Sequence, residues 1–413
     1  MAQIRRLHDR NRSFRSKCTG FNSAKRTWHQ QRVGREFCKT NLGSPMTDRL
    51  ERLFSEYGQS PWLDNLKRSY VTSGELENVR NSGIRGLTSN PTIFQKAIQG
   101  SNDYLRQFSE LIAQSVSPID CYWQMVLQDI HGALDVFMPL YESSKGHDGY
   151  VSVEVDPSLA HDQTRTLETA RALHQSISRP NVMIKIPATL EGLPAITTMI
   201  SEARNVNVTL IFSLERYQAV MDAYIDGIEI LSNTKREALS RVSSVASFFI
   251  SRVDTEIDRQ LEQSSHPDAS ALLGTAAINQ AKIAYEMFTK TFSTPRWRSL
   301  EKQGAKVQRP LWASTSTKNP NYPDTYYVDN LIGANSVNTL PDSTIEAFKL
   351  RGELRATIGL NLDRSHEQWQ NLAKVGVNVD EVASKLEREG VSSFQKSFDE
   401  LVSVLEQKAS EIS

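Results

Sequence analysis

Cysteine is scarce in this chain of 413 residues, which has only Cys18, Cys38 and Cys121. Their spacing matches neither a disulfide framework nor a zinc site, and such usage suits a reducing compartment. The eight histidines are scattered along the chain. Long apolar runs are lacking as well, since no stretch approaches the roughly 18 residues of a membrane span. These absences indicate a soluble protein and give no sign of a metal centre.

An excess of either charge is also absent, with 48 Lys and Arg against 48 Asp and Glu, but the balance is uneven. Residues 1–45 carry a net charge of +9 and the rest of the chain −9. The first 45 residues are rich in Arg, Lys, Gln, Asn and Ser and have no apolar period. We therefore expect a basic, disordered N-terminal extension over 1–45, followed by one folded domain over 46–413.

Three interpretations of this extension stay open. Met46 begins a stretch with helical apolar spacing that continues through Leu50, Leu53 and Phe54, so a start codon assigned too far upstream is one interpretation. The Arg-rich, acid-poor composition is also that of an organelle transit peptide, which would place the protein in a plastid rather than the cytoplasm. A functional arm is the third. A basic cluster alone is weak evidence for nucleic-acid binding, and we expect no such partner.

Short β-branched runs alternate with helical stretches from residue 60 onward. This alternation is typical of a parallel sheet with crossover helices. Eight repeats favour an α/β fold of the closed (β/α)8 TIM-barrel type over an open doubly wound sheet. The expected strands lie at 62–64, 85–88, 150–155, 182–186, 206–212, 242–249, 311–314 and 336–340.

Extra helices are expected in two places. The interval 252–309, between strands six and seven, is too long for one crossover helix and indicates two or three, of which 271–289 is the clearest. The C-terminal tail over 364–409 also has a helical pattern, with a break at 376–378 and a helix end at Gly390.

Polar residues interrupt the apolar strands with a period of two. Parallel strands of a barrel are buried on both faces, so one set of side chains points outward to the helices and the other points into the barrel. Here the outward set is Val and Ile, and the inward set is polar toward the carboxyl ends of the strands, where barrel active sites lie. The inward polar residues are Ser152, Glu154, Lys185, Asn207, Thr209, Ser243, Ser247, Ser314 and Ser316.

Lys185 stands between two isoleucines near the end of its strand. A lysine in such a place commonly extends its amine to water, and Glu154 would then be a simple ion-pair partner. The alternative is an amine whose pKa is lowered by apolar neighbours, which makes it a nucleophile near neutral pH. Asn207 and Thr209 favour the second interpretation, because a shell of amides and hydroxyls suits a hydroxylated substrate.

Four further features each have a structural and a functional interpretation. Asp64 would be a helix N-cap or a site carboxylate. Asn90, which precedes Pro91, would be a turn residue or a substrate-binding amide. Arg252 would begin a surface helix or bind a phosphate. The stretch STSTK at 314–318 would be a polar loop or a phosphate cradle made of small hydroxyls and one cation.

Seven segments, taken in order, resemble the transaldolase family, in particular its longer members from bacteria and plants. The resemblance covers about 47–410 and includes the helical insertion and the segment PDSTI at 341–345. The segments are WLDN at 62–65, GLTSNP at 86–91, VSVEV at 151–155, IKIPAT at 184–189, NVTLIFS at 207–213, SFFISR at 247–252 and ASTSTKN at 313–319. The basic extension matches nothing in the family.

The resemblance implies a role for each matching residue. Lys185 would form a Schiff base, and Asp64 would take the C4 hydroxyl proton when the carbon–carbon bond breaks. Glu154 and Thr209 would hold the water used to form and break the carbinolamine. The implied substrate-binding residues are Asn90 and Asn207 at the dihydroxyacetone hydroxyls and Phe249. Those implied at the phosphate are Ser247, Arg252, Ser316 and Lys318. Shorter relatives have an arginine where Lys318 stands, so Arg252 is the expected bidentate phosphate ligand.

The activity that the resemblance implies is transfer of a dihydroxyacetone unit in the non-oxidative pentose phosphate pathway. Sedoheptulose 7-phosphate or fructose 6-phosphate would be the donor, and glyceraldehyde 3-phosphate or erythrose 4-phosphate the acceptor. No cofactor or metal is expected, because the imine at Lys185 is itself the electron sink. A class I aldolase that releases free dihydroxyacetone and a non-catalytic barrel used for binding are the alternatives. Sugar phosphates are the expected partners, with no nucleic acid or membrane, for a cytoplasmic monomer or homodimer.

Overall fold

A computed structural model describes residues 48–412, which lie in one compact unit. Eight parallel strands close into a barrel in chain order, and β8 pairs with β1. The predicted (β/α)8 barrel is confirmed, and every expected strand overlaps an observed one. The strands are β1 Gln59–Leu63, β2 Gly86–Thr88, β3 Tyr150–Glu154, β4 Val182–Pro187, β5 Val206–Ile211, β6 Ser244–Phe249, β7 Arg309–Ala313 and β8 Ser336–Leu340. The expected basic extension over 1–45, and Met46 with it, lie outside the described residues.

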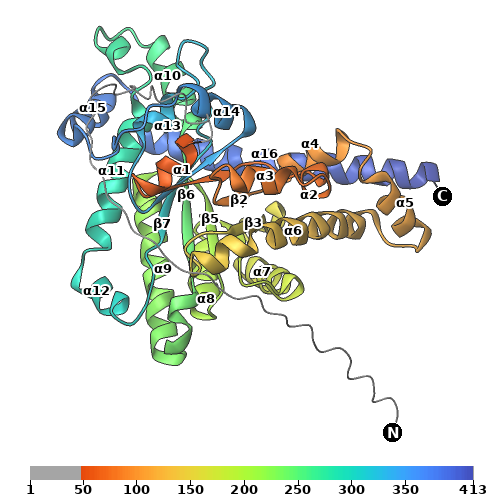
Figure 1. The fold of residues 1–413 in the computed structure, drawn as a ribbon. Helices are drawn as coiled ribbons and strands as arrows, with labels where there is room; N and C mark the ends of the chain where they lie inside the picture. Colours follow the sequence, from red (N-terminus) through yellow and green to blue (C-terminus); the bar gives the residue numbers. More distant parts are fainter. Residues whose placement is uncertain (1–47, 413) are drawn as a thin grey trace, which may run out of the picture. The chain divides into compact units, whose positions relative to one another are not determined.

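Helices surround the barrel (Figure 1). Three of them, α10 to α12, fill the interval between β6 and β7, as predicted. None of the helices within residues 48–412 combines the length and the apolar character that crossing a bilayer demands. The helices are α1 Asp48–Ser55, α2 Arg68–Thr72, α3 Glu75–Asn81, α4 Pro91–Gln99, α5 Leu105–Ala113, α6 Pro118–Ser143, α7 Gln163–Ile177, α8 Gly192–Ser201, α9 Leu214–Thr234, α10 Ser251–Gln263, α11 Ala276–Thr291, α12 Pro295–Glu301, α13 Tyr326–Asn330, α14 Asp342–Arg351, α15 Leu362–Lys374 and α16 Val379–Ile412. Short 3₁₀ segments are η1 Pro157–Leu159, η2 Arg236–Arg241 and η3 Ala269–Leu272.

The barrel interior is polar where the strand pattern predicts it. Asn207 on β5 donates to Ser152 on β3 at 3.0 Å and accepts from Ser247 on β6 at 2.7 Å. Since β4 separates β3 from β5 in the sheet, a contact between side chains of these two strands must run through the inside of the barrel. The alternation of apolar outward and polar inward residues is therefore observed on these strands.

The amino-terminal end of the barrel is closed by a buried charge cluster around Asp148, which is fully buried. Its carboxylate accepts from Arg85 at 2.6 Å, from Ser60 at 2.9 Å and from Arg309 at 3.1 Å. These residues lie at or just before the starts of β1, β2, β3 and β7. This network joins four strands at the end of the barrel opposite to the predicted site.

The C-terminal helix α16 is longer than predicted. The break at 376–378 is confirmed, but α16 passes through Gly390 without interruption, so the predicted helix end there is wrong. A Cβ at residue 390 would lie 2.9 Å from the side chain of Leu210 on β5. Glycine at this position therefore allows a close approach of the helix to the barrel, a use of glycine that a local pattern cannot distinguish from a helix stop.

Leu210 itself lies in an irregularity of β5. Its φ of 61° is left-handed, and the pairing of β5 with β6 shifts between Val208 and Ile211. A bulge of this kind re-aims side chains and is common at barrel rims. Here the rim of β5 meets α16, because Leu210 is the residue that faces Gly390.

Candidate active site

Strand register places three of the predicted residues in one row. Glu154 on β3 pairs with Lys185 on β4, and Lys185 pairs with Asn207 on β5. The Lys185 Nζ lies 3.2 Å from Glu154 Oε2 and donates to the carbonyl oxygen of Ser89, also at 3.2 Å. The side chains of Lys185 and Glu154 are only 5% and 4% exposed. The interpretation in which Lys185 extends its amine to water is therefore wrong, because the strand alternation directs this side chain into the barrel.

The Glu154 carboxyl has its pKa raised by burial, which disfavours the charged form. The positive charge of Lys185 opposes this rise, and the negative charge of Asp64 adds to it. Thr209, on β5 and fully buried, has a hydroxyl without a hydrogen-bond partner among residues 48–412. A buried hydroxyl left unpaired is costly, so its natural partner is a water or substrate group.

Asn207 is held at both ends of its amide. It donates to Ser152 and accepts from Ser247, and it is fully buried. One N–H and one lone pair of the amide remain for a ligand. The single hydroxyl proton of Ser247 is used in this contact, so Ser247 positions Asn207 in the structure as it stands.

Asp64 follows the last residue of β1. The N-cap interpretation is wrong, because the next helix, α2, begins after Lys67 and Asp64 instead accepts from the Thr88 hydroxyl at 2.8 Å. Burial raises the pKa of the Asp64 carboxyl. The charge of Lys185 and the hydrogen bond from Thr88 oppose this rise, followed by the charges of Lys318 and Arg252. Asp64 thus lies in the field of three cations that come from β4, α10 and the loop after β7.

Asn90 caps α4. Its Oδ1 accepts from the backbone N–H of Ile93 at 3.0 Å, so the structural role of this residue is that of a helix N-cap and not of the predicted turn residue. The functional interpretation remains compatible with the cap, because the amide nitrogen makes no hydrogen bond within residues 48–412.

Arg252 is the second residue of α10 and is half-buried. Its guanidinium lies over the ring of Phe249, with 5.3 Å from Cζ to the ring centroid. Burial lowers the pKa of Arg252, against the opposing charge of Asp64. Within the part of the chain that the structure describes, no hydrogen bond or ion pair occupies this guanidinium, so its donors are available to an anion.

The loop after β7 differs from the prediction in detail. β7 ends at Ala313 and Ser314 is left-handed with φ of 58°, so the prediction that Ser314 and Ser316 continue one strand face is wrong. The left-handed residue breaks the alternation, and the buried hydroxyl of Thr315 donates to Asn338 on β8 at 2.9 Å. Lys318 donates to Ser316 at 2.8 Å. Partial burial and the charge of Arg252 lower the pKa of the Lys318 amine, with a further contribution from Lys96.

Ser243 does not belong to the site. It precedes β6, and its hydroxyl accepts from Tyr150 at 2.8 Å and lies 3.2 Å from the Gly146 carbonyl oxygen. These partners lie at the amino-terminal end of the barrel. Ser243 lies four residues before Ser247, so its side chain is at the opposite end of the barrel from the predicted site.

Phe394 lies at the site, although the sequence pattern did not predict a site residue in the C-terminal tail. Its ring, on α16, has its centroid 5.8 Å from Lys185 Nζ and 6.0 Å from Arg252 Cζ. The tail has an apolar helical stripe, but such a stripe does not tell which surface the helix covers.

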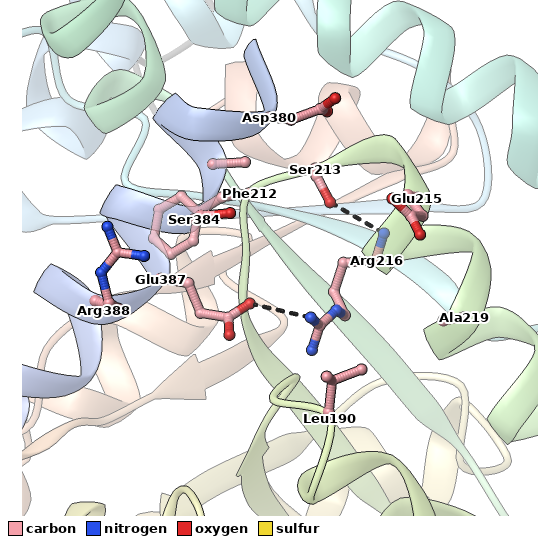
Figure 2. A pocket seen from close by; sticks show the side chains of 11 residues that line it. Leu190, Phe212, Ser213, Glu215, Arg216, Ala219, Asp380, Ser384, Glu387 and Arg388 are labelled. Carbon is pink, nitrogen blue, oxygen red and sulfur yellow. Dashed lines mark hydrogen bonds and ion pairs between the residues drawn. The ribbon is translucent and has the colours of Figure 1, made fainter. Parts of the chain in front are cut away.

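A separate pocket of about 410 Å³ lies beside the mouth of the barrel, between the start of α9 and α16. Figure 2 shows Arg216 among the lining residues, with its backbone N–H bonded to Ser213 and its guanidinium facing Glu387. None of the predicted site residues lines this pocket. Across residues 48–412, no group of three or more His, Cys, Asp or Glu side chains is placed to hold a metal ion.

The fold and the site together define a class: a closed (β/α)8 barrel with a buried lysine–carboxylate pair and an amide in its interior, and with cations at its rim. Residues 61–405 match the family model described as transaldolase/fructose-6-phosphate aldolase. The chain belongs to this family. It is 46% identical over 356 residues to the transaldolase of Frankia alni, with 86% of this chain and 96% of the relative covered. It is 44% identical to the transaldolase of Trichodesmium erythraeum and 43% identical to transaldolase 2 of Streptomyces coelicolor, each with 86% of this chain and 96% of the relative covered.

Proposed function

We propose that this chain is a transaldolase that transfers a dihydroxyacetone unit between sugar phosphates through a Schiff base on Lys185. The observation that carries the proposal is the buried contact of Lys185 with Glu154, in register with Asn207. An amine held inside a barrel beside a carboxyl, with an amide next to it, suits covalent chemistry on a hydroxylated ketone. The relatives named transaldolase support the assignment.

The first half of the reaction forms the imine. The amine of Lys185 adds to the ketone carbon of the donor, and loss of water from the carbinolamine gives a protonated imine. Glu154 is the acid/base for this water, since it contacts the Lys185 amine and burial raises the pKa of its carboxyl above the ordinary value. Thr209, with its unpaired buried hydroxyl, holds the same water.

The second half breaks the carbon–carbon bond. Asp64 removes the proton of the C4 hydroxyl, the C3–C4 electron pair moves into the iminium, and an aldose phosphate leaves. Burial raises the pKa of Asp64, which makes this carboxylate a stronger base than a carboxylate in water. The three-carbon unit stays bound to Lys185 as an enamine until an acceptor aldehyde adds and the steps reverse.

We assign the polar substrate-binding residues from the side chains that keep at least one donor without a hydrogen-bond partner within residues 48–412. Asn207 and Asn90 each offer amide donors to the dihydroxyacetone hydroxyls. Phe249, whose ring lies against the Arg252 guanidinium, is a further substrate-binding residue. Arg252 with Lys318 and Ser316 forms the phosphate site. Arg252 is the planar fork there, since Lys318 has a compact ammonium group that already donates to the Ser316 hydroxyl. We assign Ser247 to the positioning of Asn207 rather than to the phosphate itself.

The donors proposed are sedoheptulose 7-phosphate and fructose 6-phosphate, and the acceptors are glyceraldehyde 3-phosphate and erythrose 4-phosphate. We propose a cytoplasmic monomer or homodimer. A coupled assay with fructose 6-phosphate and erythrose 4-phosphate distinguishes transfer, which needs both substrates, from aldolase activity, which releases dihydroxyacetone without an acceptor.

Borohydride trapping tests the covalent residue. With fructose 6-phosphate and borohydride, the label should appear on the peptide that contains Lys185 and disappear in Lys185→Ala. Lys306→Ala is a matched control, because burial lowers the pKa of Lys306 to about 8 and its amine donates to the Gly146 carbonyl oxygen at the far end of the barrel. Label that persists in Lys185→Ala, or that is lost in Lys306→Ala, would overturn the assignment.

A further inference from the structure

The C-terminal helix α16 contributes one aromatic ring to the proposed site. Its buried residues follow a helical stripe that includes Leu386, Gly390, Phe394, Phe398 and Leu401. In Figure 1 the helix extends from the barrel alongside α4 and α6, and both helices contact it. Of this stripe, Phe394 is the residue whose ring faces both Lys185 and Arg252.

Arg252 is oriented by rings and not by hydrogen bonds. Its Cζ lies 5.3 Å from the Phe249 centroid and 6.0 Å from the Phe394 centroid, and no hydrogen bond or ion pair occupies the guanidinium within residues 48–412. Ring contacts attract a guanidinium without using its N–H donors. A phosphate-binding arginine held by ring contacts keeps all of its guanidinium N–H donors available for the phosphate. It also loses less side-chain entropy on binding than a free arginine would.

We propose that Phe394 is a positioning residue of the site, whose ring on α16 holds the Arg252 guanidinium, together with Phe249, in the orientation that receives the substrate phosphate. The inference rests on the proposed function, in which Arg252 binds that phosphate.

The place of Phe394 is fixed by anchors on both sides of it. Toward the amino-terminal side, Lys385 pairs with Glu256 of α10 at 2.9 Å, and Glu387 faces Arg216 of α9 at 3.6 Å. Toward the carboxyl-terminal side, Ser397 bonds to Thr92 of α4 at 2.8 Å. The Lys385 anchor joins α16 to α10, the helix that carries Arg252. The position of the Phe394 ring relative to the Arg252 guanidinium therefore depends on the packing of α16 against α10.

The expected effect is selective for phosphorylated substrates. Replacing the ring by an aliphatic side chain, as in Phe394→Leu, keeps most of the buried area but removes the aromatic face. A desolvated cation–ring contact corresponds to roughly a threefold to thirtyfold change in affinity. The KM for fructose 6-phosphate should rise by this factor. The KM for unphosphorylated fructose should stay the same.

Phe398→Leu is the matched control. Phe398 lies one turn further on the same helix, is similarly buried, and contacts the rings of Tyr122 and Trp123. Both variants lose one ring and comparable stability, which thermal unfolding measures. Only Phe394→Leu should change the ratio of the two KM values, and Phe394→Tyr, which keeps a ring, should restore it.

Inhibition by inorganic phosphate gives a second readout that needs no sugar. Its inhibition constant should rise by the same factor in Phe394→Leu as the KM for fructose 6-phosphate, and should rise more in Arg252→Ala. Equal KM ratios in Phe394→Leu and Phe398→Leu, or equal effects on both sugars, would overturn the inference. If Arg252→Ala leaves phosphate inhibition unchanged, the phosphate site of the proposed function fails. If Arg252→Ala weakens phosphate inhibition and Phe394→Leu does not, only the role of Phe394 fails.

Discussion

Replacing Asp254 by asparagine should stabilise this protein above neutral pH. Asp254 lies in the first turn of α10 and is 1% exposed. Its Oδ1 accepts from the backbone N–H of Ala277 at 2.7 Å. Burial raises the pKa of this carboxyl to about 7, the hydrogen bond from Ala277 opposes the rise, and the charge of Asp258 adds to it. An asparagine has the same shape and accepts the same hydrogen bond through its amide oxygen, but it never becomes charged.

The sign and the size of the effect follow from the two pKa values. The pKa in the folded state lies above the unfolded value of 3.8, so the folded protein holds this proton more tightly. The stability that this contributes is present below about pH 3.8 and is lost as the pH rises to about 7. A difference of about three pKa units corresponds to about 4 kcal/mol. Asp254→Asn should therefore gain about 1 kcal/mol at pH 4.5 and up to about 4 kcal/mol at pH 8.

Thermal unfolding of both proteins across this pH range is the assay. With an unfolding entropy of about 2 cal/mol/K per residue, a gain of about 4 kcal/mol raises the Tm of a chain of this size by roughly 5 °C. Asp268→Asn, at a side chain that is 81% exposed, is the control and should show no such trend. A Tm difference that is the same at pH 4.5 and pH 8, or a lower Tm for Asp254→Asn at pH 8, would refute the reasoning.

Three further predictions concern the phosphate site, the barrel closure and the basic extension. Arg252→Ala should raise the KM for fructose 6-phosphate roughly tenfold to a hundredfold, since a charge-assisted fork is worth about 1.5–3 kcal/mol, and steady-state kinetics with unphosphorylated fructose should show no comparable change. Asp148→Ala should lower the free energy of unfolding by about 3–5 kcal/mol in denaturant titrations, because it leaves the guanidinium groups of Arg85 and Arg309 without their buried partner; stability equal to that of the original chain would contradict this role. A chain that begins at Met46 should keep its Tm and turnover, because the strands that close the barrel all lie between residues 59 and 340. A large loss of either would show that residues 1–45 pack against the barrel.

The sequence by itself determined the strands and the polar set inside the barrel. Val and Ile alternate with Ser, Glu, Lys, Asn and Thr on β3, β4 and β5, and this period of two is a local property of the sequence that any sheet would preserve. It therefore located Glu154, Lys185, Asn207 and Thr209 correctly inside the barrel. The pattern failed where the backbone leaves the strand conformation. The backbone of Ser314 is left-handed, and the neighbouring residue types do not predict this conformation.

The tertiary structure alone decided which of these residues meet and what covers them. The contact of Lys185 with Glu154 depends on the register of β3 and β4, and the contact of Asn207 with Ser152 depends on the closed barrel. The position of Phe394 depends on how α16 docks, across Gly390 and the bulge at Leu210. Periodicity is set by neighbours a few residues apart, and a sequence pattern therefore records it. Register and docking are set by the packing of residues that lie up to a few hundred positions apart, and that packing exists only once the chain has folded.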